Sequence, residues 1–228
     1  MKRIGLVGGL GPEATVDYYR IIISEYRKKM GGNAPEIIVY SLNLGDFPNI
    51  EQKDEVVDWF VKAVGSLHRA GADFAIITAN TPHIVFDEVK ALSPMPLLSI
   101  VEETCRVVRG LNFKKAGLLG TKVTMSSDFY QRVFSPHNIS VVVPTAQEQD
   151  YINDKLMSEI IYNQIVEETR RGLLEIVRHM VDDYSIECLI LGCTELPLIL
   201  TESAFGISFL NTTRIHAESA VRFCLTGQ

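Results

Sequence analysis

Short apolar runs alternate with helix-like segments through the first part of the chain. The runs 3–9 (RIGLVGG), 36–42 (EIIVYSL) and 74–78 (FAIIT) predict strands, and the last is the continuous apolar type that parallel sheets bury on both faces. Apolar side chains at helical spacing fill both intervals, at Val16, Tyr19, Ile23, Tyr26 and Met30 and then at Val56, Phe60, Ala63, Val64 and Leu67. Strand, helix, strand, helix, strand is the pattern of an α/β fold with a parallel sheet.

The same order of patterns begins again near residue 115. The segment 115–125 (KAGLLGTKVTM) predicts a strand that ends in a glycine turn, 126–134 (SSDFYQRVF) predicts a helix, and 139–144 (ISVVVP) predicts another strand. IGLVGG begins at Ile4 and AGLLGT at Ala116, an offset of 112 residues. The repetition indicates two similar α/β units within one chain.

A second pair of stretches repeats at nearly the same offset. FAIITANTPH (74–83) and CLILGCTELP (188–197) each predict a buried strand that runs into a polar loop, and their alignment places Ala79 on Cys193, 114 residues apart. Two landmarks with similar offsets favour a tandem duplication with halves 1–110 and 111–228. The helix expected at 212–226 follows capping-type residues and is expected to pack back on the first half.

The ends of the predicted strands define where a ligand would bind. Ligands of open parallel sheets bind at the carboxyl ends of the strands, and both 79–83 and 193–195 follow such ends. The glycine turns after Val7 and Leu119 do so as well. If the two Rossmann-like halves face each other about a pseudo-twofold axis, all four loops line one cleft.

Composition narrows the class of protein. The net charge is −6 and basic residues are scattered, so nucleic-acid binding is not expected. No apolar run approaches the roughly 20 residues that cross a bilayer, and GGLGPE interrupts the apolar start, so a cytoplasmic protein without a membrane partner is expected. The four cysteines lack metal or disulfide spacing and are expected to be reduced, with Cys105, Cys188 and Cys224 in the core.

The segment 9–14 (GLGPEA) has two interpretations. It fits the dinucleotide fingerprint G-x-G-x-x-G/A in a strand-turn-helix context. However, the second strand does not end in the acidic residue that would bind a ribose, because Ser41 and Asn43 stand there. The alternative, favoured here, is a turn that presents backbone N–H groups of Gly9 and Gly11 to a small anion such as a carboxylate.

The segment 192–195 (GCTE) combines several side chains that could take part in catalysis. A small residue, a thiol, a hydroxyl and a carboxylate leave the end of a buried strand together, which predicts a thiol at a cleft rather than in the core. Backbone N–H groups at a helix start are expected to lower the pKa of Cys193 toward thiolate. At the twin position, Asn80 and Thr81 suit a carboxylate, while His83 and His216 are each either a proton carrier or a capping group.

Together these motifs resemble one family. GGLGPEAT (8–15), GADF (71–74), NTPH (80–83) and GCTELP (192–197) are similar to the aspartate/glutamate racemase superfamily, specifically its aspartate racemase branch. GLLGTKVTM, DFYQRVF and IHAESAV extend the resemblance over nearly the whole chain. The resemblance implies two pseudo-symmetric α/β domains with the active site between them, no pyridoxal or other cofactor, no metal, and a dimeric assembly.

The resemblance also implies roles for residues. In the family one cysteine from each half flanks the substrate's α-carbon, one removing the α-proton and the other supplying a proton to the opposite face. Cys193 matches the second-half cysteine, whereas Ala79 matches the first and carries no proton, so Thr78 or a water held by Asn80 is the expected substitute. The residues expected to bind substrate are Gly9, Leu10, Gly11, Asn80, Thr81, Thr121, Thr124, Thr194 and Glu195.

Three functions follow as hypotheses. The first is a cofactor-independent amino-acid racemase of the aspartate/glutamate type that is slow or one-directional. The second is a single-cysteine decarboxylase or isomerase of the same superfamily, as in its arylmalonate decarboxylase branch, and the third is a carboxylate-binding homologue without catalysis. The segments where some relatives carry cations for a distal carboxylate read LNLGDFPNIEQ (42–52) and IIYNQIVEE (160–168), without a cation. A nicotinamide or flavin oxidoreductase ranks last.

Overall fold

The fold alternates strands and helices from end to end, as the sequence predicts. The computed structural model describes residues 1–227. The strands are β1 (Ile4–Gly8), β2 (Ile37–Ser41), β3 (Phe74–Ile77), β4 (Leu97–Leu98), β5 (Lys115–Gly120), β6 (Ser140–Val142), β7 (Cys188–Gly192) and β8 (Ser208–Asn211). The α-helices are α1 (Pro12–Met30), α2 (Lys53–Arg69), α3 (Phe86–Leu92), α4 (Ile100–Gly110), α5 (Lys122–Ser126), α6 (Phe129–Phe134), α7 (Ala146–Ser158), α8 (Glu167–Tyr184), α9 (Leu196–Ile199) and α10 (Thr212–Thr226). The 3-10 turns are η1 (Leu44–Asp46), η2 (Thr81–Val85), η3 (Ser135–His137) and η4 (Ile160–Tyr162).

The strands form two parallel sheets of the same topology. The order is β2-β1-β3-β4 in the first and β6-β5-β7-β8 in the second, each with four strands. Two compact units correspond to them: residues 1–103 with the chain from Thr213 onward, and Thr104–Thr212. The predicted class, two Rossmann-like α/β units, is therefore confirmed, while the predicted division at residue 110 stays a prediction about the duplication.

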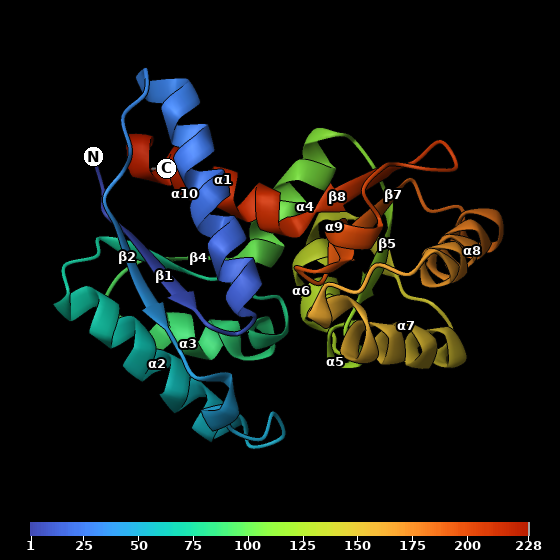
Figure 1. Cartoon of the computed structure of the whole chain (residues 1–228), viewed down its shortest axis with the longest axis horizontal. Helices are drawn as coiled ribbons and strands as arrows, with labels where there is room; N and C mark the ends of the chain where they lie inside the picture. The colour runs from blue at the N-terminus through green and yellow to red at the C-terminus, as the bar shows by residue number, and fades with distance from the viewer. Residues whose placement is uncertain (228) are drawn as a thin grey trace. The chain divides into compact units, whose positions relative to one another are not determined.

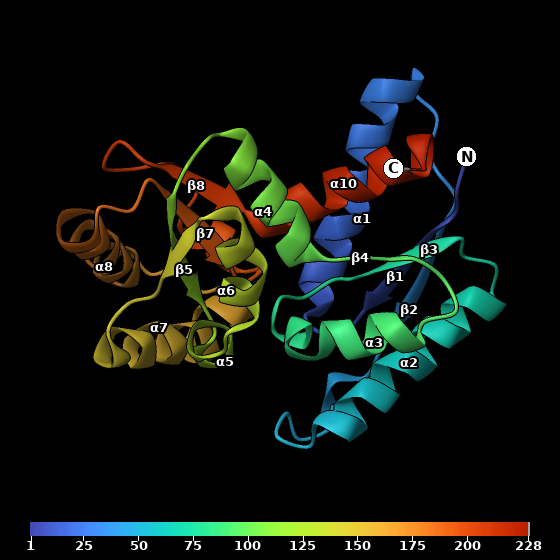
Figure 2. The same cartoon turned by 180° about the vertical axis from the view of Figure 1, so that it is seen from behind.

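In the first unit, helices cover both faces of the sheet. Residues alternate along each strand, so that Val7 and Ile77 face α2 and α3, and Leu6 and Ile76 face α1 and α10. Both views show α1 and α10 side by side on one face and α2 and α3 on the other (Figures 1 and 2). Every apolar position predicted for α2 is buried.

The buried face of α1 differs from the predicted one. Val16 and Tyr19 are 43% and 48% exposed, whereas Thr15, Tyr18 and Ile22 are buried. In the first half of the helix the shift is one residue, or about 100° around the axis, whereas Tyr26 is buried as predicted. The helix carries apolar residues on both stripes, and contact with the sheet and α10 selects the stripe that includes Tyr18. Periodicity alone had no means of choosing between them.

Helix α10 completes the core of the first unit. Ala217, Ala220, Val221 and Cys224 pack in one cluster with residues of β1, β3 and α1. Arg222 on the same helix forms an ion pair with Glu103 of α4. The C-terminal helix thus covers the sheet of the N-terminal residues.

The second unit has its own core. Leu119 of β5 and Leu189 and Leu191 of β7 pack against α7 and α8. A capping box at Thr145 and Glu148 begins α7, and the segment 160–168 is η4 and a loop before α8 begins at Glu167. Asn163 adopts φ 58° and ends η4, so this segment, where some relatives carry a cation, is not a continuous helix.

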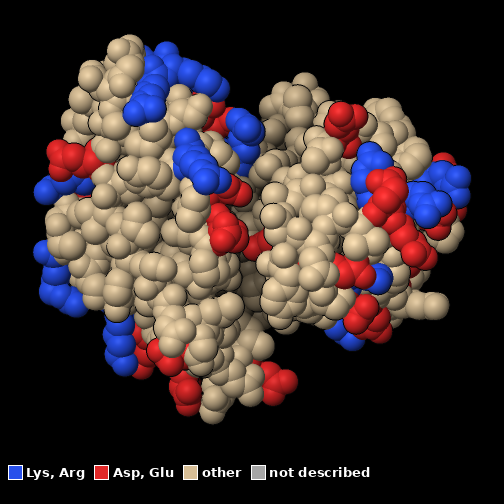
Figure 3. Space-filling view, viewed as in Figure 1, with Lys and Arg blue, Asp and Glu red and all other residues tan. Residues whose placement is uncertain are grey.

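Positively and negatively charged side chains are interspersed on the face of the molecule that Figure 3 shows. On the side of the second unit that carries α8, basic and acidic side chains lie next to one another (Figure 3). In the part of the chain that the structure describes, no helix has both the length and the apolar composition needed to cross a membrane.

Candidate active site

Two loops of the chain follow strands, β3 and β7, that occupy the same position in their sheets. Val7 pairs with Ile77 in the first sheet, and Leu119 pairs with Leu191 in the second. Ala79 lies two residues beyond Ile77, and Cys193 lies two residues beyond Leu191. When Val7 and Leu119 are aligned by the sequence repeat, Ala79 and Cys193 each lie two residues beyond the strand partner of the aligned residue.

The first-unit loop is fixed by two buried threonines. The Thr15 hydroxyl accepts a hydrogen bond from the Gly9 amide at 2.9 Å, and the Thr78 hydroxyl donates to the Val7 carbonyl at 3.1 Å. The two hydroxyl oxygens are 3.4 Å apart. Thr78 is fully buried, and its proton is engaged by the backbone. This arrangement favours a structural role over the proton-carrier role expected for Thr78.

The glycine turn after β1 lies tightly against the chain that follows β2. Gly9 adopts φ 85°, and a Cβ there would lie 2.1 Å from the Leu42 carbonyl oxygen. A side chain is thus excluded by conformation and by space together. Leu10 and Gly11 follow at half-buried positions, and Gly11 is the N-cap of α1 without a side-chain cap. Backbone N–H groups at this helix start suit the predicted anion turn.

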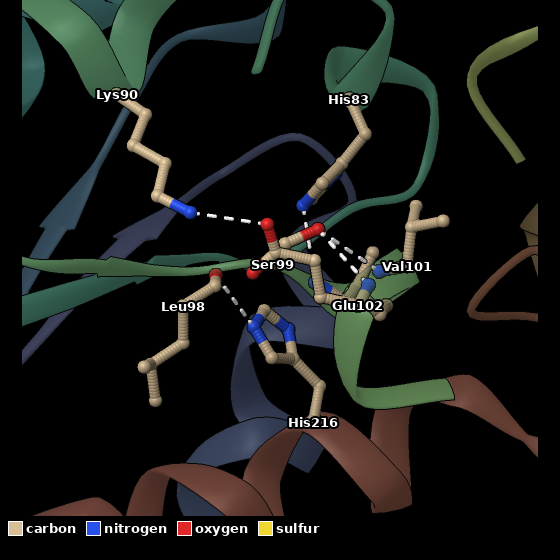
Figure 4. Close-up of polar contacts among 8 residues, drawn as sticks. His83, Lys90, Leu98, Ser99, Val101, Glu102 and His216 are labelled. Carbon is tan, nitrogen blue, oxygen red and sulfur yellow. Dashed lines mark hydrogen bonds and ion pairs between the residues drawn. The ribbon is translucent and has the colours of Figure 1, made fainter. Parts of the chain in front are cut away.

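His83 ties the Ala79 loop to the start of α4. Its Nδ1 is 3.1 Å from the Ala79 carbonyl, and its Nε2 accepts from the Ile100 amide at 3.2 Å, so the ring carries its proton on Nδ1. Figure 4 shows the His83 ring directed toward the start of α4. Ser99 caps the same helix by accepting from the Val101 and Glu102 amides. Complete burial lowers the pKa of His83 to about 3. His83 therefore holds the loop as a neutral imidazole.

His216 is a second buried imidazole of the first unit. Its Nε2 donates to the Leu98 carbonyl at 3.0 Å (Figure 4). Its Nδ1 is 3.0 Å from the Tyr18 hydroxyl. Burial lowers its pKa to about 4. Of the two roles expected for the histidines, the contacts of both favour the capping and orienting role. Asn80 is buried and Thr81 half-buried beside them, at the start of η2.

The second-unit turn after β5 carries the predicted threonines. The Thr121 hydroxyl accepts from the Thr124 amide at 3.2 Å as the N-cap of α5, and the two hydroxyl oxygens are 3.0 Å apart. A Cβ at Gly120 would lie 3.0 Å from the Thr124 methyl, and one at Gly8 would lie 2.4 Å from the Thr15 methyl. In both units a glycine at the strand end makes room for a threonine. Thr15, the last residue of GGLGPEAT, is not among the site residues predicted from the sequence.

Cys193 is more deeply placed than its sequence context predicts. Its residue is 8% exposed and packs within the core cluster of the second unit. The Sγ donates to Glu195 Oε2 at 3.0 Å, and the Thr194 hydroxyl donates to the same oxygen at 2.6 Å. All four cysteines are free thiols.

The expected lowering of the Cys193 pKa is wrong. Burial, followed by the charge of Glu195, raises the pKa of this thiol well above its ordinary value. Hydrogen bonds from the backbone of Glu195 and Thr194 act in the opposite direction but are smaller. α9 is a four-residue helix, too short to supply the field that the sequence analysis assumed.

The segment 42–52 is a loop that contains η1, with Asn43 accepting a hydrogen bond from Gly45. Among residues 1–227, no group of three His, Cys, Asp or Glu side chains could hold a metal ion.

The fold defines a class, that of α/β proteins with two Rossmann-like units whose parallel sheets have the same topology. A family model described as Asp/Glu/Hydantoin racemase matches residues 7–220, so the chain belongs to the Asp/Glu/hydantoin racemase family. It is 26% identical over 234 residues to the broad specificity amino-acid racemase RacX of Bacillus subtilis, with 99% of each chain covered.

Solved structures agree with this assignment. The chain is 32% identical to an aspartate racemase homologue from Pyrococcus horikoshii, with a TM-score of 0.87 and coverage of 98% of this chain and 99% of that one. The aspartate racemase of Picrophilus torridus has the same fold, with a TM-score of 0.80 at 24% identity over 98% of this chain and 94% of that one.

Proposed function

We propose that this chain is a cofactor-independent amino-acid racemase of the aspartate/glutamate type, with Cys193 as the thiol that moves the substrate's α-proton. The observation that carries the proposal is the place of Cys193 directly after β7, at the register-matched strand end. Family membership supports the reaction class. The substrate is a small amino acid or a related carboxylate, and the relatives' names extend from aspartate to broad specificity.

The chemistry requires help from the protein at two points. An amino acid's α-proton is a very weak acid, so the enediolate formed on its removal needs donors to its carboxylate and a nearby acid. Backbone N–H groups of the Gly9–Gly11 turn and the hydroxyls of Thr121 and Thr194 are the proposed donors. Each stands at or directly after a strand end of its own unit.

Inversion requires a second proton carrier, and here the first unit departs from the two-thiol pattern implied by the family resemblance. Ala79 has no proton to give, and the Thr78 hydroxyl donates to the Val7 carbonyl. We therefore expect racemisation to be slow, with a water held beside Asn80 as the second carrier.

The lack of a thiol at position 79 also favours one alternative function, a decarboxylase. A single thiol is sufficient to protonate one face of an enediolate left by loss of carbon dioxide, as in a malonate decarboxylase of the superfamily. The absence of a side-chain proton at Ala79 is the specific observation behind this second candidate.

The deciding experiment is proton NMR in deuterium oxide with each enantiomer of aspartate, glutamate and other amino acids, joined to chiral chromatography of the same samples. Exchange with inversion supports the racemase, and enantiopure product from a prochiral malonate supports the decarboxylase. Cys193→Ala should abolish α-proton exchange, with Cys188→Ala as the matched control at a buried thiol of the same unit. Racemisation that persists in Cys193→Ala would refute the assignment.

A further inference from the structure

The Cys193 thiol is hydrogen-bonded to a carboxylate. The Sγ of Cys193 donates to Glu195 Oε2 at 3.0 Å, and the hydroxyl of Thr194 donates to that same oxygen at 2.6 Å. The thiol is buried, whereas Thr194 and Glu195 are half-buried. A reactive group, an adjacent base and a third group that orients the base are the parts of an activated thiol.

We propose that Glu195 is the proton acceptor of the Cys193 thiol and positions it to act on substrate, with Thr194 orienting the carboxylate. This inference rests on the proposed function and adds to it the residue that makes a buried thiol usable as a base. Glu195 is thus a positioning residue acting through Cys193, in place of the substrate-binding role expected from the sequence.

The proposed step balances without a free thiolate. As the Cα–H bond of the substrate breaks, its proton forms a new S–H bond, and the original thiol proton passes from Sγ to Glu195 Oε2. The electron pair of the broken bond remains on the substrate as an enediolate. In the reverse step, Glu195 returns its proton to sulfur while the thiol delivers its own proton to the α-carbon.

The electrostatics of the thiol explain why such an acceptor is needed. Burial and the charge of Glu195 both raise the pKa of Cys193, so the resting group is the protonated thiol. In the described part of the chain, Glu195 is the charged side chain whose field acts on this sulfur. A protonated thiol donates a proton readily but removes one only if its own proton has a destination.

Glu195→Gln separates a proton-accepting role from a merely structural one. Glutamine keeps the length of the side chain and one carbonyl oxygen for the Thr194 and Cys193 donors, but it loses the charge and the basic oxygen. Glu202→Gln is the matched control, because it makes the same change of charge at an exposed residue of the same unit.

The first readout is iodoacetamide alkylation of the thiol across pH, without substrate. Cys193→Ser measures the background from the three other buried cysteines. In Glu195→Gln, we expect the pH profile of alkylation to move down by about one unit or more, about tenfold faster reaction at pH 8. Glu202→Gln should match wild type. An unshifted profile in Glu195→Gln would overturn the proposal.

The second readout is α-proton exchange in deuterium oxide with the amino acid that wild type exchanges. Glu195→Gln should lose at least about tenfold in exchange rate, although its thiol ionises more readily, and Glu195→Asp should recover part of the loss. An unchanged rate in Glu195→Gln overturns the proposal. If wild type exchanges no amino acid, the proposed function fails, and an unshifted alkylation profile in Glu195→Gln would then overturn the action of Glu195 on the thiol as well.

Discussion

Acidification from pH 8 to pH 5 is expected to destabilise the first unit through its two buried imidazoles. Burial lowers the pKa of His83 to about 3 and that of His216 to about 4, while the unfolded chain has histidine pKa values of about 6.5. The unfolded state therefore binds protons first as pH falls. The stability that neutral burial provides is fully present above pH 6.5 and is lost progressively toward pH 4.

The size of the effect follows from these pKa values. At pH 5 both rings are still neutral in the fold, while nearly every unfolded copy has taken up two protons. Each ring then accounts for a loss of about 2 kcal/mol relative to pH 8, or about 4 kcal/mol for the pair. That is a large fraction of the roughly 5–15 kcal/mol by which domains are stable.

Other ionisable groups change the stability outside the range from pH 8 to pH 5, or change it in the opposite direction. The carboxyl groups with lowered pKa, among them Asp73 and Glu148, cost stability only below about pH 4.5. His179 has a raised pKa beside Glu148, so its pairing contributes below pH 6.5 and is lost as pH rises. It is exposed, and its contribution has the opposite sign to that of the buried pair.

Urea unfolding at pH 8, 7, 6 and 5 measures the effect, followed by the fluorescence of Trp59. This single tryptophan lies on α2 of the first unit, in the same unit as both histidines. His83→Gln and His216→Gln should each remove about half of the pH dependence, because glutamine does not titrate. A change below about 1 kcal/mol between pH 8 and pH 5, or a variant with the full wild-type dependence, would refute the reasoning.

Three further outcomes test other parts of the structure. On the proposed mechanism, Ala79→Cys should raise the ratio of inversion to α-proton exchange by about 100-fold, measured by chiral chromatography beside NMR; an unchanged ratio counts against it. Gly9→Ala should cost at least about 1–3 kcal/mol, because φ is positive there and the new Cβ meets the Leu42 carbonyl; urea unfolding tests this, and wild-type stability would contradict it. Tyr18→Phe removes a donor from buried Nδ1 of His216 and should cost about 1–3 kcal/mol by the same assay; a neutral result would indicate that water replaces the hydroxyl.

The sequence alone determined the order of elements and the equivalence of the two loops. Continuous apolar runs that end in glycine predict strands, because a parallel sheet requires apolar residues on both faces. The offsets that align Ala79 with Cys193 come from the sequence, and both residues follow the strand, β3 or β7, that occupies the same position in its sheet. The requirement for glycine at position 9 could also be predicted from the sequence, because a tight turn between a strand and a helix favours glycine.

Only the tertiary structure decided which face of a helix is buried and which protonation state an ionisable group adopts. Val16 and Tyr18 both fit helical periodicity, and packing against α10, distant in sequence, selected Tyr18. The pKa of Cys193 moved upward because its burial arises from a core that α7, α8 and α9 build around it. Burial and long-range contacts are sums over neighbours from the whole chain, and a local pattern of residues contains neither.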